Sequence, residues 1–124
     1  MAVYKWVVPN TLAVSPMPSS DDIEDIVSRF KCMVVLATSE GLLYDVKLVA
    51  ESDPRVLHVP VPGFSAPNII ELQEIVEFIR SCDKPVLVHC SSDGGRNGSV
   101  AVAYLMASQG IGYREALSMA RSAL

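Results

Sequence analysis

The chain has 124 residues, of which 50% are hydrophobic and 19% charged, so it can form a core of its own and is not intrinsically disordered. Ten lysines and arginines against fourteen aspartates and glutamates give a net charge of −4, which argues against a nucleic-acid partner. No apolar run approaches the roughly 20 residues that a membrane-spanning helix needs, so we expect no membrane partner.

The three cysteines, Cys32, Cys82 and Cys90, cannot pair off evenly, and a chain of this length does not depend on disulfides for its core. The first eight residues also lack the apolar run of a signal peptide. We therefore expect a cytoplasmic protein in a reducing compartment. Cys32 and Cys82 are either plain core residues, or one of them lies near enough to Cys90 to form a protective disulfide.

Short apolar runs alternate with segments of helical periodicity along the chain. Residues 32–37 and 85–89 are continuous apolar runs, typical of strands that are buried on both faces of a sheet. Ser19 and Ser20 can cap a helix whose apolar residues then recur at helical spacing. In chain order, we expect strands over residues 4–8, 11–14, 32–37, 56–59 and 85–89, with helices from 19, over 42–50, from 67, from 96 and over 113–124.

Two of these helices have features that place them in the fold. Pro67 is suited to be a first helical residue. The apolar face behind it comprises Ile69, Leu72, Ile75, Val76 and Ile79. The helix after Arg96 should lie in the middle of the core, because residues 97–113 include no charged side chain, and Gly110 and Gly112 should end it.

Strands that alternate with helices indicate an α/β fold with a mostly parallel sheet. We expect a single domain over residues 1–124, in which a central sheet of four to five strands is flanked by helices.

The loop between the strand at 85–89 and the next helix is the most informative segment. It reads Cys90-Ser91-Ser92-Asp93-Gly94-Gly95-Arg96. A helix N-terminus presents unpaired N–H groups and a partial positive charge, which bind phosphate and stabilise a thiolate. Gly94 and Gly95 let successive N–H groups turn inward as an anion nest, and Arg96 can bond two phosphate oxygens at once. The loop therefore combines a nucleophile, an anion cradle and a fixed positive charge.

His89-Cys90, five residues and then Arg96 resemble the H-C-x5-R signature of the cysteine-dependent protein tyrosine phosphatases. Residues 12–18, the proline-rich loop at 60–67 and the uncharged helix are also similar to those of small archaeal and dual-specificity phosphatases. The resemblance implies a protein tyrosine phosphatase-like fold, and a phosphocysteine intermediate at Cys90 that forms without metal or cofactor. It also implies that His89 organises the loop and tunes the thiolate.

The implied substrate is a phosphorylated protein or a small phosphate monoester, from phosphotyrosine to the wider range of a dual-specificity enzyme. The residues expected to bind the phosphate, or a similar oxyanion, are Ser91, Ser92, Asp93, Gly94, Gly95 and Arg96.

Three residues depart from the pattern of that family. Gly63 stands where the family usually has its aspartate general acid, in a stretch that reads Pro60-Val61-Pro62-Gly63. Asp93 stands where the loop normally has glycine, and a nearby phosphate favours its protonated form, so it is a candidate substitute acid. The alternative is that Asp93 points to solvent at the rim of the loop. Asn97 replaces the serine or threonine that helps the thiolate to leave, which predicts slow breakdown of the intermediate.

Alternative interpretations remain for the whole chain and for single residues. The chain could be a catalytically impaired pseudophosphatase that binds phosphorylated ligands, or more remotely a rhodanese-like sulfurtransferase. Cys90 could be a small buried hydrophobic residue, and His89 a core histidine whose hydrogen bonds are all satisfied. We interpret His58 as structural, and the spacing of histidines and cysteines does not suggest a zinc site.

Overall fold

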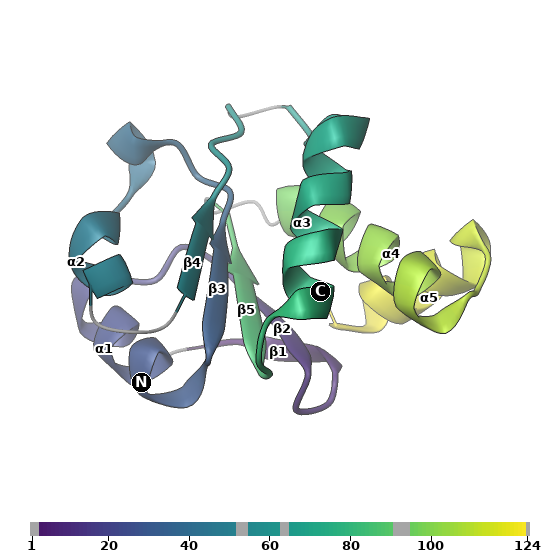
Figure 1. Ribbon diagram of the computed structural model, residues 1–124, viewed down its shortest axis with the longest axis horizontal. Coiled ribbons are helices and arrows are strands. Elements are labelled where there is room, and N and C mark those ends of the chain that lie inside the picture. The colour runs from purple at the N-terminus through teal and green to yellow at the C-terminus, as the bar shows by residue number, and fades with distance from the viewer. Residues whose placement is uncertain (1–2, 52–54, 63–64, 91–94, 124) are drawn as a thin grey trace.

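The computed structural model describes residues 3–51, 55–62, 65–90 and 95–123 (Figure 1). Within these ranges the strands are β1 (Lys5–Val8), β2 (Leu12–Ser15), β3 (Cys32–Val35), β4 (Arg55–His58) and β5 (Val86–His89). The helices are α1 (Ser20–Arg29), the 3-10 turn η1 (Ser39–Gly41), α2 (Val46–Glu51), α3 (Ile69–Ser81), α4 (Gly95–Gln109) and α5 (Tyr113–Ala123).

The five strands form one mixed sheet in the order β1-β2-β5-β3-β4. Only the hairpin of β1 and β2 is antiparallel, while β2, β5, β3 and β4 run parallel to one another. The expected α/β class and mostly parallel sheet are confirmed. Because the four parallel strands end at the same edge, the loops that follow them meet there, which is where open α/β sheets bind their ligands.

Helices cover both faces of the sheet, with α1 and α2 on one side and α3, α4 and α5 on the other (Figure 1). This arrangement buries the central strand β5 on both of its faces. Val86 and Val88 pack toward the three-helix side and Leu87 toward the other, and all three are fully buried. A strand enclosed in this way holds its carboxyl end in a fixed position.

Much of α4 is buried in the core on the three-helix side of the sheet, as the absence of charged residues after Arg96 predicts. Val100, Ala101 and Leu105 are fully buried, whereas the last turn from Met106 onward is exposed. The helix ends at Gln109, and Gly110 follows with a φ of +65°, a conformation that favours glycine.

Two details of the expected helices are wrong. Pro67 is not the first helical residue, because Asn68 caps α3 and α3 begins at Ile69. The Asn68 side chain accepts from the Glu71 amide at 2.8 Å, and the Glu71 carboxylate accepts from the Asn68 amide at 2.9 Å. Ile69 is therefore on the first turn, where it is 69% exposed and lies outside the buried face.

The segment expected to be helical over 42–50 is helical only from Val46. The residues before it form the turn η1 and an irregular stretch that contains Tyr44. No helix among the described residues is both long enough and apolar enough to span a bilayer.

Candidate active site

Cys90 directly follows the central strand β5 and is fully buried. Its neighbours Ser91, Ser92, Asp93 and Gly94 lie outside the described residues, as does Gly63. The chain is described again from Gly95, where α4 begins. Cys90 and the first turn of α4 thus lie at the two ends of one short connection, the strand, loop and helix order expected from the sequence.

Arg96 lies in the first turn of α4 and is only 4% exposed. Its Nη1 donates a hydrogen bond to the carbonyl oxygen of Val61 at 2.6 Å. Val61 is itself held in place, because its amide donates to the carbonyl oxygen of Leu36 at 2.9 Å. The guanidinium is therefore fixed against the chain that connects β4 and α3, which contains the proline-rich loop. No sequence signal pointed to this bond.

His89 is fully buried and hydrogen-bonded at both ring nitrogens. Its Nδ1 lies 3.2 Å from the carbonyl oxygen of Cys90, and its Nε2 contacts the hydroxyl of Tyr44. A carbonyl oxygen can only accept, so Nδ1 carries the proton and Nε2 accepts from Tyr44. Burial lowers the pKa of His89 to about 4, so the ring is neutral at physiological pH.

The neutral ring changes the role expected for His89. It supplies no positive charge to a thiolate, and its contact is with the backbone of Cys90. His89 therefore fixes the orientation of the residue that follows it. Tyr44, which fixes His89 in turn, was missed by sequence reasoning because it lies 45 residues away in an irregular segment.

Asn97 is 2% exposed and links α4 to the end of β2. Its Nδ2 donates to the carbonyl oxygen of Ser15 at 2.8 Å. Its Oδ1 is buried and has no hydrogen-bond partner in the part of the chain that the structure describes. The amide therefore holds the helix against the sheet, a role that a serine or threonine hydroxyl is too short to copy in the same way.

Cys32 and Cys82 lie where the parallel strands begin, whereas Cys90 lies where they end. Cys32 pairs with Val86 at the start of β5, and Cys90 is four residues further on, about 13 Å along the strand. A disulfide needs Cα atoms within about 7 Å, so Cys32 cannot bond to Cys90. Burial, and a hydrogen bond that the Cys32 thiol donates to Cys82, raise the pKa of Cys32 to about 12, and this contact places Cys82 beside Cys32. These two cysteines are core neighbours, and the alternative of a protective disulfide to Cys90 is wrong.

His58, the other histidine that could have bound a metal, makes a contact within the fold. His58 Nε2 donates to the carbonyl oxygen of Ala37 at 2.7 Å, which agrees with its interpretation as structural. In the described ranges, no group of three histidine, cysteine or acidic residues could hold a metal ion.

Residues 18–110 match the Tc-R-P family model, whose description is "Polymorphic toxin system, DSP-PTPase phosphatase". The chain belongs to this family of DSP-PTPase phosphatases. The expected phosphatase family is confirmed, and the rhodanese-like alternative has no support.

Solved structures and curated relatives agree with this assignment. The chain is 35% identical to Tk-PTP in its active form, with a TM-score of 0.88 over 97% of this chain and 83% of that one. It is 28% identical over 119 residues to the dual specificity protein phosphatase Mpk3 of Drosophila melanogaster, covering 93% of this chain and 28% of the relative. It is 30% identical over 70 residues to the dual specificity protein phosphatase OPG106 of Vaccinia virus, covering 53% of this chain and 41% of the relative. The chain thus spans less than half the length of both of these curated relatives. Family and fold thus agree that the chain is of the DSP-PTPase phosphatase type.

The neutral His89 makes the stability of the protein depend on pH. The unfolded chain binds this proton near pH 6.5, and the folded one only near pH 4, so the unfolded state gains protons first as the pH falls. The free energy of unfolding should be highest above pH 6.5 and lose up to about 3 kcal/mol from this group as the pH drops to 4. Urea unfolding across this range measures the effect.

The matched control is His89→Asn, which retains a donor near the Nδ1 position but does not titrate. We expect the pH dependence of wild type to exceed that of the variant between pH 6.5 and 4. Equal slopes in the two proteins would show that His89 is not held neutral.

Proposed function

We propose that this chain is a cysteine-dependent phosphatase that hydrolyses phosphate monoesters of proteins through a phosphocysteine intermediate at Cys90. The observation that carries the proposal is the placement of Cys90 at the end of the buried central strand, with five residues between it and Arg96 in the first turn of α4. Phosphotyrosine is the expected substrate group, with phosphoserine and phosphothreonine as the wider range of a dual-specificity enzyme.

The proposed reaction has two displacements at phosphorus. The Cys90 thiolate attacks, so that a sulfur–phosphorus bond forms and the bond to the leaving oxygen breaks, and that oxygen takes up a proton. Water then attacks the phosphocysteine, which releases inorganic phosphate and regenerates the thiolate. No metal or cofactor enters either step.

Three features of this chain would stabilise the transferred phosphoryl group. The N-terminus of α4 presents backbone N–H groups at Gly95 and beyond, with the positive end of the helix dipole. Arg96 cannot lose its proton and can bond two phosphoryl oxygens at once. The loop residues Ser91, Ser92, Asp93, Gly94 and Gly95 would add further amides.

The general acid is the least conventional part of the proposal. Gly63 cannot donate a proton, and we propose that Asp93 protonates the leaving oxygen in its place. The support is the coincidence in the sequence of one acid absent and another present inside the phosphate loop. In this account the bound phosphoryl group keeps Asp93 protonated until the leaving group departs.

We place the protein in the cytoplasm, because the reaction needs a reduced Cys90. The three cysteines are all free thiols in the structure, which is compatible with a reducing compartment.

Hydrolysis of p-nitrophenyl phosphate tests the proposed function. Cys90→Ser should lower kcat by about a thousandfold or more, because the hydroxyl is a far weaker nucleophile. Cys82→Ser is the matched control, since it makes the same change at the far edge of the sheet and should leave kcat within about twofold. Turnover by wild type no faster than by Cys90→Ser would instead indicate a pseudophosphatase, in which Arg96 and the loop bind phosphate without cleaving the ester.

The role of Asp93 predicts a dependence on the leaving group. Asp93→Ala should lower kcat for an alkyl phosphate such as phosphoserine by about a hundredfold or more, because an alkoxide needs a proton to leave. The loss for p-nitrophenyl phosphate should be much smaller, and the alkaline side of its pH profile should flatten, because a general acid is active only while it is protonated. Asp83→Ala is the matched control, an exposed aspartate beyond α3. Equal kinetics for Asp93→Ala and wild type on both substrates would place Asp93 at the solvent-facing rim.

A further inference from the structure

An apolar groove of about 540 Å³ runs over α4, between α3 and α5. Both flanking helices pack against α4, so its outward surface forms the floor of the groove. The apolar side chains that line it are Ile69 and Leu72 from α3, Val102 and Met106 from α4, and Tyr113 and Leu117 from α5.

Several of these side chains are more exposed than their size leads one to expect. Ile69 is 69% exposed, Tyr113 is 58% exposed and Met106 is 37% exposed. Ile70, beside Ile69 on α3, is 71% exposed. An exposed apolar patch of this kind on a soluble domain typically marks an interaction site.

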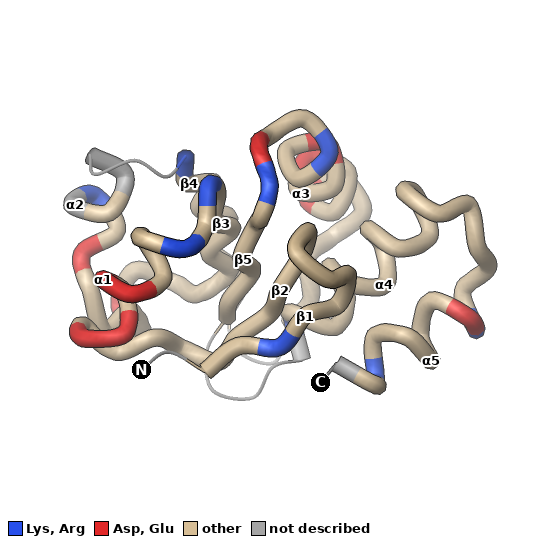
Figure 2. The backbone as a smooth tube through the Cα atoms, turned by 90° about the horizontal axis from the view of Figure 1, so that it is seen from below, with Lys and Arg blue, Asp and Glu red and all other residues tan. Residues whose placement is uncertain are grey.

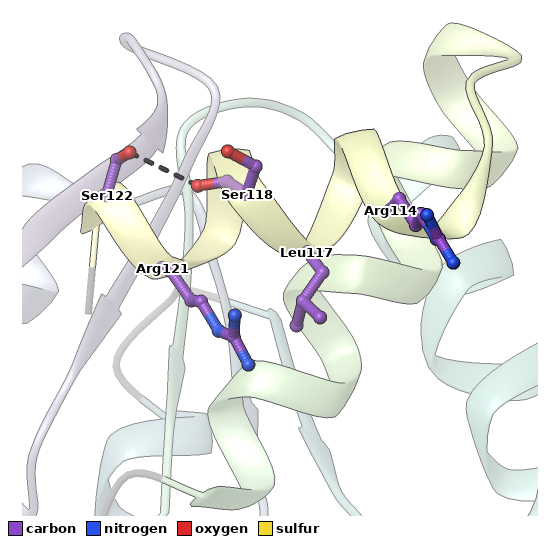
Figure 3. A pocket seen from close by; sticks show the side chains of 5 residues that line it. All are labelled: Arg114, Leu117, Ser118, Arg121 and Ser122. Carbon is purple, nitrogen blue, oxygen red and sulfur yellow. Dashed lines mark hydrogen bonds between the residues drawn. The ribbon is translucent and has the colours of Figure 1, made fainter.

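The rim of the groove on α5 is positively charged. Arg114 and Arg121 are seven residues apart, two helical turns or about 10 Å, and Leu117 lies between them. Figure 3 shows the three side chains projecting from the same side of α5, where they line a second pocket of about 470 Å³. Leu117 and Arg121 line both the pocket and the groove, so the two form one surface.

Neither arginine is neutralised by another side chain in the part of the protein that the structure describes. Within the described ranges, neither guanidinium has a hydrogen-bond or ion-pair partner. The floor cannot compensate them either, because α4 has no aspartate or glutamate along its length (Figure 2). The groove therefore has an apolar floor and a positively charged rim, although the chain as a whole has a net charge of −4. Such a surface is complementary to a partner that is both apolar and negatively charged.

The spacing of these features matches a helix as the occupant. An amphipathic helix presents apolar residues at intervals of three and four, which can fill a groove between two other helices. Carboxylates seven residues apart on such a helix recur at the same distance as Arg114 and Arg121.

The groove also lies close to the proposed catalytic loop along the same helix. Gly98 and Ser99 line its near end, two and three residues after Arg96. From Gly98 to Met106 the floor extends about 12 Å along α4. A partner seated in the groove is therefore anchored to the helix whose first turn would bind the phosphoryl group.

We propose that this groove docks an acidic amphipathic helix of the phosphorylated protein substrate, an inference that rests on the proposed function. The helix inserts its apolar residues between α3 and α5, and its carboxylates pair with Arg114 and Arg121. Docking raises the local concentration of the phosphorylated residue near Cys90, so it lowers KM for substrates that carry the helix.

A binding measurement tests the groove without catalysis. The probe is a fluorescein-labelled helical peptide with leucines on one face and two glutamates seven residues apart, and binding is followed by fluorescence anisotropy. The charge reversal Arg114→Glu with Arg121→Glu should weaken binding at least tenfold. The matched control, Lys31→Glu with Lys47→Glu, changes two exposed lysines away from the groove and should change binding less than twofold.

Two further results would overturn the proposal. The first is equal binding of a peptide in which the two glutamates are lysines, because it would show apolar adhesion without charge recognition. The second is dimerisation of the protein in sedimentation velocity that the arginine reversal abolishes, because the occupant would then be a second copy of this chain. Failure of the reversal to weaken binding would overturn the proposal as well.

A kinetic measurement separates this inference from the proposed function. A phosphotyrosine peptide joined to the acidic helix should show a KM about tenfold below that of the phosphotyrosine peptide alone, with the same kcat. The arginine reversal should remove this advantage and leave p-nitrophenyl phosphate hydrolysis unchanged. Hydrolysis of p-nitrophenyl phosphate without any KM advantage would overturn the groove proposal alone. Binding of the helix by a protein that hydrolyses none of these substrates would overturn the proposed function, and with it the assignment of the helix to a substrate.

Discussion

The buried positive charge of Arg96 is the constraint on which the rest of the site depends. A guanidinium keeps its proton at every physiological pH, so a side chain that is only 4% exposed must be surrounded by acceptors. The carbonyl oxygen of Val61, 2.6 Å away, is one of them. A carbonyl dipole offsets only part of a full charge, and a phosphate placed at the start of α4 would offset far more of it. The fold thus favours an anion at the position where the proposed chemistry needs one.

Each described residue beside the loop is held by a different part of the chain. His89 is held by Tyr44 from the segment before α2, Arg96 by Val61 from the chain after β4, and Asn97 by Ser15 at the end of β2. These segments come together because the parallel strands β2, β5, β3 and β4 end at one edge of the sheet. Cys90 and the first turn of α4 are therefore positioned by the whole sheet, which is the preorganisation that catalysis by a fixed nucleophile and a fixed cation requires.

The elements and the loop could be predicted from the sequence because their signals are local. The continuous apolar run before Cys90 indicated a central strand, and the uncharged stretch after Arg96 indicated the buried helix α4. The start of α3 was misplaced because Pro67 and Asn68 both suit a helix start, and only the reciprocal bonds with Glu71 decide between them. The contacts of Tyr44, Val61 and Ser15 with the site could not be predicted, because they join residues far apart in sequence with no motif to mark them.

In the proposed reaction, Asn97 connects the architecture of the site with the rate of the second displacement. Its amide donates to Ser15, and it stands where the resemblance to protein tyrosine phosphatases leads one to expect a serine or threonine. Formation of the phosphocysteine should therefore be faster than its breakdown. The same amide couples α4 to β2, so replacing it has a structural effect as well as a kinetic one.

The most direct test of the central claim is rapid mixing of the enzyme with p-nitrophenyl phosphate, followed by acid quenching and peptide mapping. We predict a burst of p-nitrophenol nearly equal to the enzyme concentration, a slower steady state, and a phosphoryl group on the peptide that contains Cys90. Turnover without a burst and with no phosphoryl group on Cys90 would contradict the account.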